Sequence, residues 1–171
     1  MSNRFPAIEP PHTHHLLAVT GWLELGNAAE AEVELNRIPR TLWAHPAVLE
    51  ARWAIAAFRN EWAEGAAIAQ ELVDACPDNA CGWLHRAYAL RRSPGGSLAL
   101  ARTALLPALT LFPTESVIPY NLACYACQMG ELEEARALLR LAVKSGGKKH
   151  IQSMALADSD LEPLWPEVRT L

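Results

Sequence analysis

Basic charge is scarce in this chain. Its 171 residues include 15 Lys and Arg against 19 Asp and Glu, which gives a formal net charge of −4. Because nucleic-acid binding needs a basic face that neutralises phosphates, this balance argues against a nucleic-acid partner. Aromatic residues make up only 7% of the chain, yet six of them are tryptophan, so large rings are concentrated at few positions.

Long hydrophobic runs are also missing. The longest, at 105–112, contains Pro107 and Thr110 and is too short to cross a bilayer. The first fifteen residues, MSNRFPAIEPPHTHH, lack the apolar core of a secretory signal. Without such a signal, four cysteines are expected to be free thiols in a reducing compartment. We therefore expect a cytoplasmic protein with no membrane partner.

No segment alternates apolar and polar residues with a period of two, so no strand is predicted. Alanine is abundant, which favours helices, and glycines and prolines separate runs with helical spacing. The sequence therefore predicts an all-α protein. The expected helices cover 13–25, 28–38, 46–58, 62–76, 80–92, 97–112 with a kink at Pro107, 114–129, 132–144 and 149–157. A short apolar cluster at 161–165 is expected to cover the last pair of helices before it.

The chain also repeats itself. Small residues recur at spacings of 34, 36 and 34, at Ala31, Gly65, Ala101 and Ala135. Five residues before each of them comes a turn former, at Gly26, Asn60, Gly96 and Gly130. Self-similarity at such a period is typical of architectures built by stacking one helical unit on the next.

The pattern resembles the tetratricopeptide repeat (TPR) family, most clearly in the fourth repeat, from Tyr120-Asn121-Leu122-Ala123 through Gly130 to Ala135 and Ala142. The second repeat departs from it, because Trp53 stands where the family has a small residue. The resemblance implies a right-handed α-solenoid of about four helix-turn-helix repeats. It would form a single TPR domain over 12–171, with repeats at 12–45, 46–79, 80–115 and 116–149, a cap at 150–171 and an irregular leader at 1–11.

In this family, set positions of each first helix line a concave groove that binds a peptide or protein segment. Carried over by position, the resemblance implies a groove formed by Glu50, Phe58, Cys81, Leu84, Tyr88, Arg91, Arg92, Val117, Tyr120, Cys124 and Gln128. The adjacent arginines would meet a carboxylate of the partner. The alternative is that they only solubilise the end of a helix and complement its dipole.

No arrangement of residues typical of an enzyme is present, so we expect no catalytic residue. Cys124 and Cys127 form a C-x-x-C motif, but a structural zinc site needs four ligands and no second pair has suitable spacing. We therefore expect no metal and no cofactor, and a scaffold or adaptor that binds protein. Two alternatives stay open: a self-associating module, such as a homodimer, and a metal or small ligand held by Cys81, Cys124 and Cys127.

Overall fold

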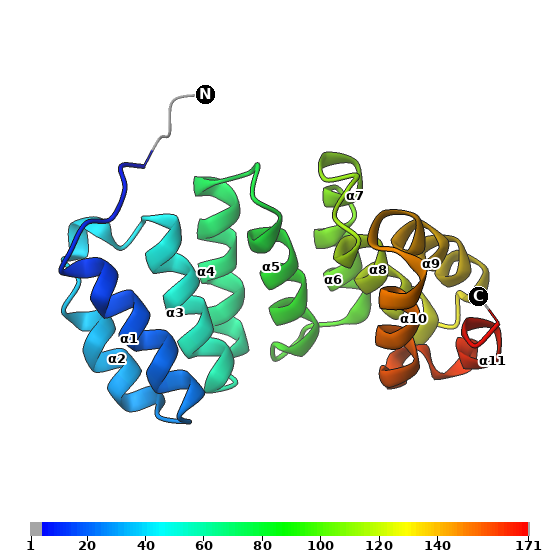
Figure 1. Ribbon diagram of the computed structural model, residues 1–171, viewed down its shortest axis with the longest axis horizontal. Helices are drawn as coiled ribbons and strands as arrows, with labels where there is room; N and C mark the ends of the chain where they lie inside the picture. The colour runs from blue at the N-terminus through cyan, green and yellow to red at the C-terminus, as the bar shows by residue number, and fades with distance from the viewer. Residues whose placement is uncertain (1–4, 171) are drawn as a thin grey trace. The chain divides into compact units, whose positions relative to one another are not determined.

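The computed structural model describes residues 5–170, and every regular element in that range is helical (Figure 1). This confirms the predicted all-α class. The elements in order are α1 (His12–Glu24), α2 (Ala28–Asn36), η1 (Arg40–Leu42), α3 (Pro46–Phe58), α4 (Trp62–Ala75), α5 (Ala80–Arg92), α6 (Leu98–Leu105), α7 (Ala108–Leu111), α8 (Val117–Gln128), α9 (Leu132–Gly146), α10 (Lys148–Ala157), η2 (Ser159–Leu164) and α11 (Trp165–Val168).

The chain divides into two compact units, and the division falls between Pro94 and Gly95. We call the part up to Pro94 unit 1 and the part from Gly95 unit 2. The boundary lies inside the expected third repeat, in the turn between its two helices. Each unit is described by itself below.

Unit 1 consists of helices packed in sequence, α1 on α2, α3 on α4 and α4 on α5. Local signals start these helices: the side chain of Asn27 accepts a hydrogen bond from the Glu30 N–H, and that of Asn79 accepts one from the Cys81 N–H. Two buried clusters hold the helices together. One cluster consists of Val19, Ala31, Leu35, Ile38, Val48 and Ile55. The other consists of Leu49, Ala56, Ile68 and Leu72.

Unit 2 is built around the hairpin of α8 and α9. Helix α6 packs on α8, α10 packs on α9, and η2 returns to α8. Leu161 and Leu164 of η2 are fully buried, so the apolar cluster predicted near the C-terminus does cover part of the last hairpin. Burial of these side chains gives the C-terminal segment a fixed place on the unit.

The structure differs from the predicted elements mainly at prolines and helix ends. Pro107 breaks the helix predicted for 97–112 into α6 and α7, because it has no N–H to donate and its ring crowds the preceding turn. Helix α8 begins at Val117, three residues later than the earliest start predicted. The short helix η1 was not predicted. The four recurring small residues Ala31, Gly65, Ala101 and Ala135 are all buried, which confirms that they are packing positions.

The predicted leader at 1–11 is described from Phe5 onward, and residues 1–4 lie outside the described residues. Residues 5–11 form no helix. The ring of Phe5 meets the His45 ring edge-on, with centroids 5.5 Å apart, and Ile8 packs against the core of unit 1. The described part of the leader is therefore docked on unit 1.

Candidate functional site

An arginine and a tyrosine stack on the surface of unit 1. Tyr88 lies in α5 and Arg92 ends that helix one turn later, so the two side chains share a face. The guanidinium carbon of Arg92 lies 3.4 Å from the centroid of the Tyr88 ring, a cation–π contact. Arg92 Nη1 also donates a hydrogen bond to the Tyr88 carbonyl oxygen at 3.2 Å. The guanidinium is thus held in one orientation.

A second ring, that of Trp62 in the first turn of α4, completes this arrangement. It meets the Tyr88 ring edge-on, with centroids 5.6 Å apart, and lies 5.7 Å from the Arg92 guanidinium. Leu84 precedes Tyr88 by one turn on the same side of α5. We call Trp62, Leu84, Tyr88 and Arg92 the aromatic–arginine surface. Phe58, the last residue of α3 and four residues before Trp62, is 47% exposed.

Beneath this surface lies a stacked pair of rings. The His85 imidazole is parallel to the Trp53 indole, with centroids 3.7 Å apart and an interplanar angle of 10°. Burial lowers the pKa of His85 from 6.5 to about 4, because the charged imidazolium would lose its hydration. Trp53 also meets the edge of Tyr88, at 6.3 Å between centroids. The pair therefore supports Tyr88 from below.

The charge of Arg92 is not neutralised by an ion pair within the described part of the chain. Among residues 5–170, no carboxylate forms an ion pair with Arg92. Tyr88 remains 39% exposed. A cation that is oriented, partly ringed by aromatic side chains and open to solvent can donate two parallel hydrogen bonds to a carboxylate.

The other groove residues predicted in unit 1 are Cys81 and Arg91, on α5, and Glu50, on α3. Cys81 is exposed, two turns before Tyr88 on α5, while Arg91 is half-buried. Glu50 lines a separate groove of about 520 Å³ between α1 and α3. Trp53, Trp62 and His85 were not among the predicted site residues. The misfit of Trp53 with the repeat pattern was the one sequence signal that pointed to this cluster.

The groove residues predicted in unit 2 have a different environment. Tyr120 and Cys124 are buried, and the Tyr120 hydroxyl donates a hydrogen bond to Asp158 Oδ2 at 3.0 Å. The Cys124 thiol donates to the same oxygen at 3.5 Å. Gln128 Nε2 donates to the Asp160 carbonyl oxygen at 3.0 Å, whereas Val117 is exposed. The C-terminal segment therefore contacts the face of α8 that carries Tyr120, Cys124 and Gln128.

The same contacts bring potential metal ligands together. One ligand atom each from Cys124, Asp158 and Asp160 lies within 4.8 Å of the others. These donors already bond one another or nearby groups, since Asp158 accepts from Tyr120, from Cys124 and from the Asp160 N–H. Burial raises the pKa of Cys127 and of Tyr120, which keeps both groups protonated. The arrangement is one that ties α8 to the start of η2.

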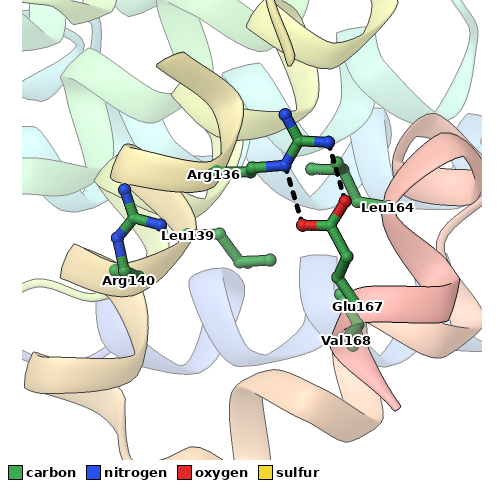
Figure 2. Close-up of a pocket in the computed structure, with 6 residues that line it drawn as sticks. All are labelled: Arg136, Leu139, Arg140, Leu164, Glu167 and Val168. Atoms are coloured by element: carbon green, nitrogen blue, oxygen red, sulfur yellow. Dashed lines mark hydrogen bonds and ion pairs between the residues drawn. The ribbon is translucent and has the colours of Figure 1, made fainter. Parts of the chain in front are cut away.

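A small pocket of about 80 Å³ lies between α9 and the C-terminal helices, and Figure 2 shows an ion pair across it. Arg136 Nε and Nη2 each donate to a Glu167 carboxylate oxygen at 2.7 Å. Hydrogen bonding to Arg136 lowers the pKa of Glu167. Arg136 and Glu167 thus satisfy each other, in contrast to Arg92.

None of the helices in the described part of the chain is long and apolar enough to span a membrane. No protein-family model matches the sequence, and no curated protein matches it either.

Proposed function

We propose that this protein is a non-catalytic adaptor that binds a protein or peptide segment at the aromatic–arginine surface of unit 1. One observation carries the proposal: Arg92 is held against Tyr88 and Trp62 and forms no ion pair with a carboxylate of residues 5–170. Trp, Tyr and Arg are the residue types that contribute most to protein–protein binding free energy. An ordered guanidinium also loses little entropy when a partner binds.

The partner's recognition element is a carboxylate next to an apolar side chain. The carboxylate would accept two hydrogen bonds from Arg92, while the apolar group would pack on Leu84 and the exposed part of Tyr88. Helices α1 and α2 pack on each other, as do α3 and α4. These pairs support the inference that unit 1 contains TPR-type repeats. A stack of such repeats presents extended surfaces to partners and has no chemistry of its own.

The test is a pull-down from native lysate with the full chain and the double variant Tyr88→Ala, Arg92→Glu. A partner that binds at this surface should be lost with the variant, because both its aromatic contact and its charge partner are gone. Arg37→Glu, a charge reversal at another exposed arginine of unit 1, is the control and should retain the partner. Identical protein profiles for the wild type and the double variant would contradict the proposal.

Self-association is a second candidate function, supported by a stripe on α1. Leu17 and Leu25 are 71% and 76% exposed, and the position between them on the same face, Gly21, has open space beside it. A second copy could cover this stripe, since large exposed apolar groups mark interaction surfaces. Sedimentation velocity over a range of concentrations tests it: Leu17→Glu should abolish any dimer, and a monomer at all concentrations contradicts it.

A further inference from the structure

Unit 2 carries an apolar groove that the adaptor proposal does not use. It has a volume of about 550 Å³ and lies between α7, the start of α8 and the end of α9. Its walls are mostly hydrophobic, with one cation at the rim, and include Leu109, Phe112, Pro113, Pro119, Leu141 and Lys144. Leu141 is 46% exposed. The groove can therefore take up apolar side chains from outside the unit.

The segment that supplies Leu141 and Lys144 to this groove is positively charged, although the chain as a whole is acidic. Residues 135–157 include five Lys and Arg residues and no Asp or Glu, and they hold all three lysines of the chain. Among residues 5–170, none of Lys144, Lys148 and Lys149 has an ion-pair partner. By contrast, Arg136 in the same segment is paired with Glu133 and Glu167.

Two of these lysines occupy positions that are unfavourable for the isolated protein. Lys148 and Lys149 lie in the first turn of α10, which contains no acidic residue. Cations at the positive end of a helix dipole raise the free energy of the folded state, as does repulsion between neighbouring cations. An anionic partner would relieve both effects, so the positive field complements a negatively charged ligand.

We propose that this groove, with Lys144 in its lining and with Lys148 and Lys149 in the first turn of the following helix, docks an acidic protein segment that carries apolar anchor residues. The groove selects a protein over other polyanions, because a nucleic-acid backbone or the flat face of a membrane offers no apolar side chains to fill it. Carboxylates flanking the anchors would pair with the lysines. This surface is on a different unit from the aromatic–arginine surface, and the inference does not depend on the proposed function.

Selection from a random peptide display library on the immobilised full chain tests the inference. The enriched peptides should be rich in Asp and Glu and should contain Leu, Phe or Trp. Fluorescence anisotropy with one enriched peptide then measures the effect of variants. Lys144→Glu with Lys148→Glu should weaken binding at least about tenfold, and so should Leu141→Ser. The interaction should also weaken as salt is raised.

Matched controls keep the test specific. Arg37→Glu with Arg169→Glu makes the same change in net charge at exposed positions outside the groove, and Leu25→Ser removes an exposed leucine of unit 1. Both should bind the peptide as the wild type does, and so should Tyr88→Ala with Arg92→Glu, which separates this surface from the first.

Three outcomes would overturn the inference. One is enrichment of neutral or basic peptides, or no enrichment. Another is peptide binding that the lysine and Leu141 variants leave unchanged. The third is binding to phosphatidylserine vesicles or to a short DNA duplex that depends on the lysines but not on Leu141, with no acidic peptide selected.

Discussion

The imidazole of His85 lies flat against the indole of Trp53, with ring centroids 3.7 Å apart. This contact joins α3 to α5 within unit 1. Burial holds the pKa of His85 at about 4, below its ordinary value of 6.5. An unfolded chain binds a proton at this histidine near pH 6.5, whereas the folded chain does so only near pH 4.

The free energy of unfolding of unit 1 should consequently fall as the pH drops from 6.5 to 4, because within this interval only the unfolded state binds the proton. The total loss should be roughly 3 kcal/mol, and no further loss from this group should follow below pH 4. Urea unfolding at several pH values measures it. His85→Gln should flatten the dependence over this interval, while His150→Gln, at an exposed position, should not. An unchanged slope in His85→Gln would refute the assignment.

Alanine substitution should affect the stability of the protein differently at two buried glycines, Gly82 and Gly65. A Cβ on Gly82 would lie 3.1 Å from the Val73 backbone nitrogen and 3.2 Å from Leu72 Cγ. Helix α5 would have to move away from α4, so Gly82→Ala should destabilise the protein by roughly 1–3 kcal/mol. A Cβ on Gly65 would make ordinary contacts at 3.7 Å with Trp53 and Ala89.

Gly65→Ala should therefore be neutral or stabilising by roughly 0.5–1 kcal/mol, because alanine favours the helix. Gly65→Leu should still destabilise, since the larger side chain overpacks the same space. Thermal unfolding of the three variants checks these expectations. A Gly82→Ala protein as stable as the wild type would show that α4 and α5 are not in the close contact described.

The parts of the fold that sequence predicts well are those with local causes. The bounds of α3 and α5 match the prediction because Pro46 begins one helix, and Asn79 and Ser93 flank the other. The parts that were missed depend on partners far along the chain. Trp53 and His85 are 32 positions apart, and Tyr120 bonds to Asp158 over 38 positions. The hydrophobic periodicity of a sequence does not indicate contacts between residues so far apart.

The candidate site, too, was predicted where its causes are local and missed where they depend on distant residues. The resemblance to a repeat family selected Leu84, Tyr88 and Arg92, which share one face of α5 for reasons of helical spacing. It also selected Tyr120 and Cys124, which occupy the equivalent face of α8 but are buried under the segment around Asp158. A repeat pattern predicts which side of a helix a residue occupies. It does not predict which distant segment of the chain packs against that side.

The bond between Tyr120 and Asp158 should stabilise unit 2. Tyr120→Phe removes the hydroxyl and leaves Asp158 with the Cys124 thiol and the Asp160 N–H, so the loss should be roughly 1–2 kcal/mol. Asp158→Ala removes all three acceptor contacts and should cost more. Tyr88→Phe is the matched control, because the structure shows no hydrogen bond to that exposed hydroxyl among residues 5–170. Equal unfolding free energies for Tyr120→Phe and Tyr88→Phe would refute this role.

Binding at the aromatic–arginine surface should require an arginine at position 92 and not merely a positive charge. The guanidinium is planar, stacks on Tyr88 and can donate two parallel hydrogen bonds to one carboxylate, whereas the lysine ammonium has neither the planar shape nor the paired donors. Arg92→Lys should therefore weaken the partner roughly tenfold or more, with the net charge unchanged. Arg37→Lys, at an exposed site on α2's C-terminal end, should have no effect. If Arg92→Lys bound as tightly as the wild type, Arg92 would act as a simple point charge, and the stacked geometry would have no part in recognition.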